Sequence, residues 1–124
     1  MDKIIIERFG GFFTGSRAFG VGKEESDYDY ILEPDQYFSF LAYLVDNNIE
    51  YKKSEYFIGA FFEHEDKKYN VFLVHNTRFD VWVFATEIMK NICEKKLLPI
   101  IYLKEKQLRI RLFENLRNLY RNFE

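Results

Sequence analysis

The chain has few residues of the kinds that build crosslinked or metal-clustered proteins, and it has no long apolar run. Its 124 residues include one cysteine, Cys93, and two histidines. A single cysteine excludes a disulfide within the chain and is typical of proteins from a reducing compartment. No apolar run approaches the length of a membrane span, and the first residues do not follow the basic-then-apolar pattern of a secretion signal. The composition therefore predicts a cytoplasmic protein with no membrane association.

Neither sign of charge is in large excess. Lys and Arg total 18 and Asp and Glu total 20, which gives a formal net charge of −2. The chain thus lacks the overall positive charge typical of nucleic-acid-binding proteins, and any such contact is expected to be local. Basic residues are concentrated in the last third, where a solvated face and a surface for RNA or an acidic protein are alternative interpretations: Lys95, Lys96, Lys104, Lys106, Arg109, Arg111, Arg117 and Arg121.

Apolar and aromatic residues are plentiful. Hydrophobic residues make up 48% of the chain, with 14 Phe and 9 Tyr, which is enough to build a folded core. A chain of this length forms one domain, so residues 1–124 are expected to fold together. Most rings are interpreted as core, with stacking on nucleic-acid bases as the alternative for exposed ones.

The spacing of apolar residues predicts short strands and amphipathic helices. Strands are expected at Phe12–Thr14, Tyr28–Leu32, Glu55–Phe62 and Tyr69–His75, the last two forming a hairpin around the charged turn His64–Lys68. Helices are expected at Asp35–Asn47, from Asn76 or Thr77 to Cys93, and at Lys104–Asn122, with a single helical turn at Arg17–Phe19.

This order of elements predicts an α/β (α+β) fold, a small mixed β-sheet with helices packed mainly on one face. In the first long helix, Phe38, Leu41, Leu44 and Val45 follow the helical period and are expected to face inward. Residues 3–9 form a run too short to assign to a strand or a helix.

The segment Thr14–Tyr30, TGSRAFGVGKEESDYDY, combines a Gly-Ser pair with two acids. Gly15 and Ser16 offer a tight turn, backbone N–H groups and a hydroxyl, which are groups that hold phosphate. Asp27 and Asp29 lie two residues apart, so on a strand they project from the same face. Two close carboxylates repel each other unless a cation lies between them, and Mg²⁺ favours carboxylates together with substrate phosphates. The segment therefore predicts a phosphate site beside a magnesium site.

This spacing resembles the signature of the DNA polymerase β-like nucleotidyltransferase superfamily in its minimal form. The sequence GSRAFG…ESDYDYIL is similar to the corresponding segment of minimal nucleotidyltransferase antitoxins. It is more similar to that of small phage-encoded nucleotidyltransferase-like proteins. Those also carry a strand resembling YNVFLV, a helix resembling FDVWVFATEIMK and a basic helix like Lys106–Tyr120. The resemblance covers most of the chain, although only the Gly-Ser to Asp-x-Asp motif is specific. It implies a nucleotidyltransferase-like fold.

The resemblance also implies roles for the motif residues. Asp27 and Asp29 would be catalytic and bind Mg²⁺, which neutralises charge during in-line attack on the α-phosphorus of a nucleoside triphosphate. Gly15 and Ser16 would hold the β- and γ-phosphates. Arg17 suits bidentate contact with a phosphate, with surface solvation as the alternative.

A third acid completes the site in catalytic members, and the resemblance aligns Asn70 with it. The Asn70 amide oxygen is a metal ligand in this interpretation, but an amide cannot act as a general base. Glu63, at the end of the preceding strand, is an alternative third acid, as is a base on the substrate.

Two functions are therefore open. The first is Mg²⁺-dependent transfer of a nucleoside monophosphate from a nucleoside triphosphate to a hydroxyl of a protein, an RNA, a small molecule or a second copy of the chain, as in a homo-oligomer. The second is a non-catalytic nucleotide-binding or partner-docking module, because Asn70 replaces the third carboxylate.

Overall fold

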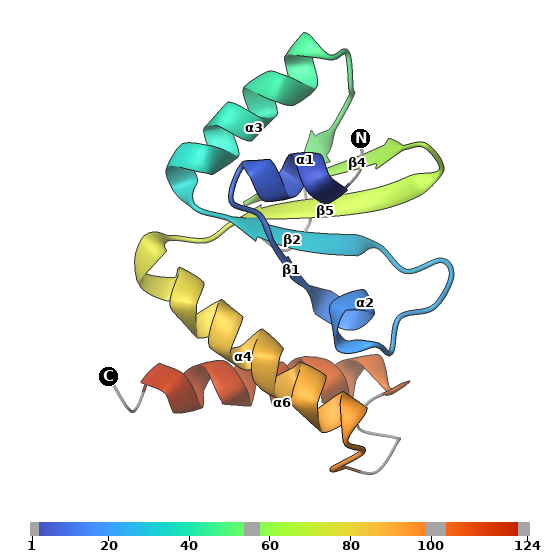
Figure 1. The fold of residues 1–124 in the computed structure, drawn as a ribbon, viewed down its shortest axis with the longest axis vertical. Coiled ribbons are helices and arrows are strands. Elements are labelled where there is room, and N and C mark those ends of the chain that lie inside the picture. The colour runs from blue at the N-terminus through green and yellow to red at the C-terminus, as the bar shows by residue number, and fades with distance from the viewer. Residues whose placement is uncertain (1–2, 54–57, 99–103, 122–124) are drawn as a thin grey trace.

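A five-stranded mixed sheet lies between two groups of helices (Figure 1). The computed structural model describes residues 3–53, 58–98 and 104–121. Along the sheet the strands run in the order β1 (Phe12–Thr14), β2 (Tyr28–Leu32), β5 (Lys67–Leu73), β4 (Gly59–His64) and β3 (Lys52–Lys53). The β2–β5 pair is parallel and the other three pairs are antiparallel. The prediction of a mixed α/β sheet is confirmed.

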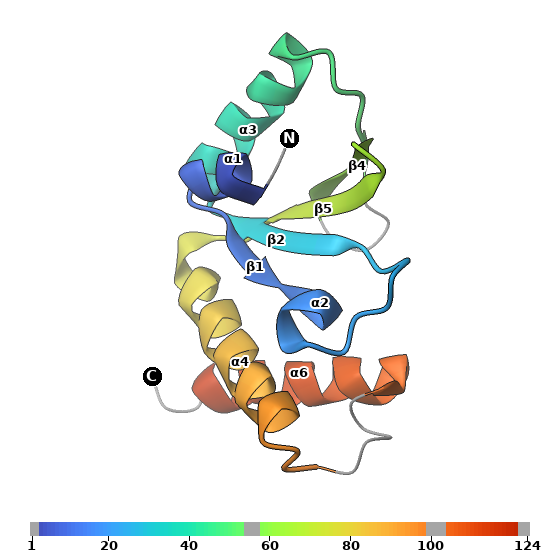
Figure 2. The same ribbon diagram turned by 45° about the vertical axis from the view of Figure 1, so that its right-hand side comes forward.

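The helices cover both faces of the sheet, as two views of the ribbon show (Figures 1 and 2). On one side lie α1 (Lys3–Arg8) and α3 (Pro34–Asp46), and on the other lie α2 (Gly15–Phe19), α4 (Asn76–Glu94) and α6 (Lys106–Arg121). The prediction of helices mainly on one face was therefore wrong. Its physical reason lies in β2, where Tyr30 and Ile31 point to opposite faces and are both fully buried. A strand that is apolar on both faces needs cover on both.

Most of the predicted elements occur where the sequence indicates them. The strands at Phe12–Thr14 and Tyr28–Leu32 have the predicted bounds, and β4 and β5 form the expected hairpin around Glu65 and Asp66. Residues 3–9, left unassigned by the sequence, are mostly helical, and Lys52–Lys53 forms a two-residue edge strand where a polar connection was expected. The predicted strand start at residues 55–57, the break at Pro99 and the helix end at Asn122 lie outside the described residues.

The inward face of α3 is the predicted one only in part: Leu44 is buried and Leu41 packs against the core as expected, but Phe38 and Val45 do not. Tyr37, Phe40 and Leu44 are buried and pack with strand residues of the main core cluster. Phe38 and Val45, expected to face inward, are each 62% exposed. Both sets of residues follow the helical period, so the periodicity alone did not choose between them. Packing against aromatic side chains of the sheet determines which face of α3 is buried. One example is Phe62, whose ring centroid lies 5.9 Å from that of Phe40.

The contrast between Leu44 and Val45 gives a direct test of this orientation. We expect Leu44→Ala to lower the free energy of unfolding by about 2–5 kcal/mol, because it leaves a cavity in the core. Val45→Ala, on the neighbouring exposed position, should change it by less than about 1 kcal/mol. Urea denaturation of the two variants measures both values. Equal losses would contradict the observed rotation of α3.

Candidate functional site

One row of residues across three strands brings the predicted site together. Asp29 on β2 lies opposite Thr14 on β1 and opposite Asn70 on β5. Asp27 precedes β2 by one residue. The sheet therefore places both predicted acids and the predicted third position side by side, although Asn70 is 43 residues from Asp27 in the chain.

Asn70 joins the two acids directly. Its side-chain nitrogen Nδ2 donates a hydrogen bond of 2.8 Å to Asp27 Oδ2 and one of 3.3 Å to Asp29 Oδ1. An amide NH₂ group has two donors, and here each one meets a carboxylate. The amide thus holds the two acids close together, but it brings no positive charge to balance them.

The electrostatics of the site centre on Asp29. Burial raises the pKa of the Asp29 carboxyl from 3.8 to about 7, and the negative charge of Asp27 acts in the same direction. The hydrogen bond from Asn70 and the charges of Lys106 and Arg109 lower this pKa but do not offset the burial. Near neutral pH, the Asp29 carboxyl is therefore protonated in a large share of the molecules, and a bound cation would favour loss of that proton.

Gly15 lies against the Asp29 carboxylate at the start of α2. Its φ of +83° is in the left-handed region, which a residue with a Cβ rarely adopts. A Cβ built on Gly15 would meet Asp29 Oδ2, and it would lie 2.9 Å from Asp29 Cγ. The Gly-Ser turn therefore lies directly against one of the two acids, Asp29, with Ser16 half-buried beside it.

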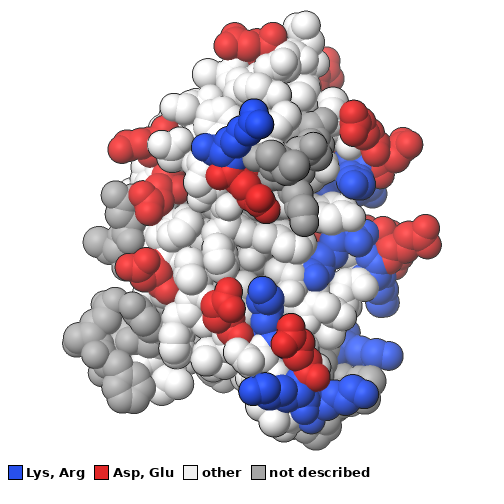
Figure 3. Space-filling view, viewed as in Figure 1, with Lys and Arg blue, Asp and Glu red and all other residues white. Residues whose placement is uncertain are grey.

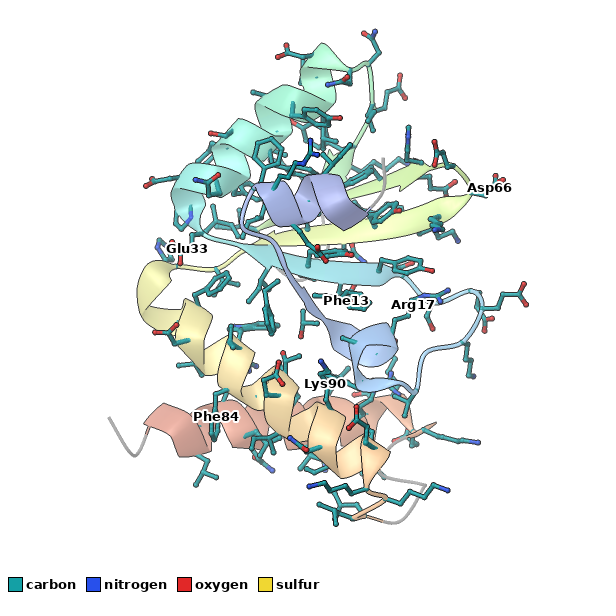
Figure 4. All side chains as sticks on the ribbon, in the orientation of Figure 1. Phe13, Arg17, Glu33, Asp66, Phe84 and Lys90 are labelled. Carbon is teal, nitrogen blue, oxygen red and sulfur yellow. The ribbon has the colours of Figure 1, made fainter. Side chains whose placement is uncertain are left out.

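The Arg17 side chain makes contacts within the chain that the sequence did not predict. Its Nε donates to the Ser26 backbone carbonyl at 2.8 Å, and its Nη2 donates to that of Glu24 at 2.6 Å. The guanidinium also lies over the Tyr28 ring, 4.2 Å from its centroid. Figure 4 shows the side chain directed from α2 toward the start of β2. These contacts tie the loop 20–26 to β2, and a phosphate contact by Arg17 stays a prediction.

Glu63 does not join the acid pair. It is exposed on β4, where it lies opposite Lys68 of β5. Strand β5 separates it from β2, which places the two backbones roughly 10 Å apart at the usual strand spacing. Asn70, and not Glu63, therefore takes the position next to Asp27 and Asp29.

Two features of the surroundings were not assigned to the site from the sequence. Thr86 on α4 donates a hydrogen bond of 2.7 Å to the Trp82 carbonyl, so the 2.7 Å contact between Thr14 and Thr86 is donated by Thr14. This buried bond fixes α4 to β1 next to Asp29. The second feature is the pair Lys106 and Arg109, which appeared in the sequence only as members of a basic segment. No local pattern indicated either one, because both depend on how distant helices pack.

The donor set at the acids suits a hard cation. Two carboxylates and one amide offer only oxygen ligands once the amide is turned to present its oxygen, which is the chemistry that Mg²⁺ prefers. The raised pKa of Asp29, caused mainly by burial and in part by the charge of Asp27, is consistent with this, because a bound cation would stabilise the ionised form of the buried carboxylate. Among the described residues, no group of three His, Cys, Asp or Glu side chains could hold a metal. Any metal here would thus rely on two carboxylates, the amide and its own bound ligand.

Comparisons of the chain with protein-family models, with curated proteins and with solved structures gave no match. The resemblance to nucleotidyltransferases consequently stays a prediction. In the part of the chain that the structure describes, none of the helices is both long enough and apolar enough to cross a membrane.

The pKa of Asp29 predicts how stability depends on pH in a metal-free buffer. Between 3.8, the value for the free side chain, and about 7, the folded protein binds more protons at this site than the unfolded chain does. The contribution of Asp29 is therefore most favourable below the lower value and is lost as pH rises to the upper one. We expect Asp29→Asn to gain up to a few kcal/mol relative to the wild type between about pH 4 and about pH 8.

Urea denaturation at several pH values in the presence of EDTA measures this gain. Glu87→Gln, at an exposed position on α4, is the matched control and should keep the wild-type pH dependence. A stability difference between Asp29→Asn and the wild type that is constant with pH would contradict the raised pKa.

Gly15 and Gly20 form a second matched pair, because both have positive φ angles of 83° and 87°. No atom of the described residues lies within 4 Å of a Cβ built on Gly20, whereas one built on Gly15 meets Asp29. We expect Gly20→Ala to cost about 1–2 kcal/mol from backbone strain alone. Gly15→Ala should cost at least about 1 kcal/mol more, because the Asp29 carboxylate must also move. Chemical denaturation measures both losses, and similar values would contradict the close approach of Gly15 to Asp29.

Proposed function

We propose that this domain is a Mg²⁺-dependent nucleotidyltransferase, which moves a nucleoside monophosphate from a nucleoside triphosphate to a hydroxyl acceptor. The observation that carries this proposal is the grouping of Asp27, Asp29 and Asn70 beside the Gly15 turn. Two partly buried acids with only a neutral amide between them favour a divalent cation. A phosphate-accepting turn next to them favours a ligand that brings both phosphate and metal.

The chemistry follows from these positions. In the proposed complex, Asp27 and Asp29 would hold Mg²⁺ in their ionised forms, with the Asn70 oxygen as a neutral third ligand. The ion would supply positive charge to the phosphates while the acceptor oxygen bonds to the α-phosphorus and the bond from that phosphorus to the leaving pyrophosphate breaks. The backbone N–H groups of Gly15 and Ser16 hold the leaving phosphates. The acceptor's proton passes to solvent or to a base on the acceptor, because Asn70 cannot take it.

A second candidate function is favoured by Asn70 itself. Among the described residues no third carboxylate lies next to the acids, so that part of the chain does not supply the group that would hold a second metal tightly and activate the acceptor. A domain with such a site can bind a metal–nucleotide complex without turning it over. It would then act as a nucleotide-binding or docking module for a protein or RNA partner.

Asn70→Asp separates the two candidates. The variant adds a negative charge beside Asp27 and Asp29, and we expect Mn²⁺ affinity to rise about tenfold or more. Transfer from α-labelled triphosphates to acceptors in a cell extract should occur in the wild type and increase in the variant. Transfer gained only by the variant would favour the non-catalytic candidate. Asn91→Asp, an exposed change of the same charge on α4, is the control and should alter neither measurement.

Calorimetry with Mg²⁺ and each nucleoside triphosphate tests the shared premise. Micromolar to millimolar binding of at least one triphosphate, lost in Asp27→Asn, is the expected result. A folded wild-type protein that binds no triphosphate and no divalent cation would contradict both candidates.

A further inference from the structure

The N-terminal half of α6 lies beside α2, which starts at the candidate site. The Phe113 ring of α6 packs against Phe19 of α2, with centroids 5.7 Å apart, and against Trp82 of α4, with centroids 5.1 Å apart. Arg117 follows one turn later, its guanidinium 4.7 Å from the centroid of the Trp82 ring. Figures 1 and 2 both show the start of α6 beneath α2. The face of α6 that carries Phe113 is therefore the face turned toward the site.

Two cations share that face. Lys106, Arg109 and Phe113 are spaced by three and four residues, which places them on one side of the helix. Lys106 is exposed and Arg109 is half-buried. Both lie close enough to Asp29 for their charges to lower its pKa. Helical spacing and ring packing thus place these two side chains on the face of α6 that is turned toward α2, and the first residue of α2, Gly15, lies against Asp29.

Lys106 borders the acids without pairing with them. No described residue lies within ion-pair distance of its ammonium. Its position is also unfavourable for a lysine, because α6 begins there and the start of a helix carries a partial positive charge. Glu105 accepts bonds from the backbone N–H groups of Gln107 and Leu108, so the helix end itself already has a carboxylate partner. Within the described part of the chain, no carboxylate pairs with this ammonium, which suits contact with an anionic ligand.

The positive charge at this point is local. On the face of the molecule in Figure 3, most of the described basic side chains gather at the right and lower right, with acidic ones among them, whereas the left edge carries acidic side chains. The site has two carboxylates, Asp27 and Asp29, and the facing side of α6 has two cations, Lys106 and Arg109. This arrangement suits a ligand that carries positive charge at one end and negative charge at the other. A polyphosphate that carries a divalent cation has this pattern, because the metal meets the carboxylates and the outer phosphates meet the cations.

We propose that Lys106 and Arg109 bind the outer phosphates of the nucleotide held at Asp27 and Asp29, so that α6 selects triphosphates over monophosphates. This inference rests on the proposed function and deepens it. Removal of the two charges should weaken binding of any Mg²⁺–polyphosphate, whatever its base. It should leave the metal site intact.

The test compares Lys106→Gln/Arg109→Gln with Arg111→Gln, a control for charge on an exposed residue of α6 that lies about 200° around the helix from Arg109. Glutamine keeps part of each side-chain stem, and circular dichroism verifies folding. Calorimetry with Mg²⁺ and inorganic tripolyphosphate, and with Mg²⁺ and ATP, should show affinity reduced by about tenfold or more in the double variant only. Binding of Mn²⁺ alone should be unchanged or tighter in the double variant, because two neighbouring positive charges are gone.

The outcomes separate this inference from the proposed function. If the double variant binds Mg²⁺–tripolyphosphate and Mg²⁺–ATP as the control does, while Asp27→Asn abolishes binding, Lys106 and Arg109 do not contact the phosphates and the metal–nucleotide site stands. If the wild type binds Mn²⁺ but no polyphosphate, this inference and the nucleotide function are both wrong, and the acids form a simple cation site. If the wild type binds neither, the acid pair is not a ligand site.

Discussion

The burial of one carboxylate beside another is the constraint on which this domain depends. Asp29 lies in a sheet row between Thr14 and Asn70, against Gly15, and shares the Asn70 amide with Asp27. Burying an ionised acid is costly unless it is paired, and here the partner is a neutral amide. The protein meets part of this cost by keeping a proton on Asp29 up to about pH 7. The buried acid pair therefore lowers the stability of the fold, and the same pair favours binding of a cation.

The rest of the structure holds this row in place from outside. The buried hydrogen bond between Thr14 and Thr86 anchors β1 to α4, and the rings of Phe19 and Phe113 anchor α2 to α6. Arg17 ties down the loop that connects the Gly-Ser turn to the acids. Each contact joins an element of the site to one that lies far away in the sequence or would otherwise move independently. A site made of short strands and a five-residue helix gains its rigidity in this way.

The part of the site that sequence could predict is the part encoded locally. The spacing of two between Asp27 and Asp29 predicted that they project to the same side, and the shared Asn70 amide shows them together although Asp27 lies just before β2. Gly15 was likewise predicted as a turn. The role of Asn70 came from a resemblance, and its place beside Asp29 came from the strand register. Packing decided what the sequence left open. Phe38 and Tyr37 follow equally regular helical stripes, yet only Tyr37 is buried. The packing of Phe113 on Phe19 turns the face of α6 that carries Lys106 and Arg109 toward α2, which no local pattern indicated.

The parallel pairing of β2 with β5 has a consequence for how the domain opens. Between these strands the chain leaves the sheet, forms α3 and returns through β3 and β4, so no local hairpin can hold the acids next to Asn70. If β2 and β5 separate, Asp29 and Asn70 no longer lie side by side. During folding, they come together only once the chain between these two strands has folded back to pair them. A ligand that binds across β2 and β5 therefore stabilises the whole sheet against cooperative unfolding. Its binding should slow amide hydrogen exchange even in strands that it does not contact.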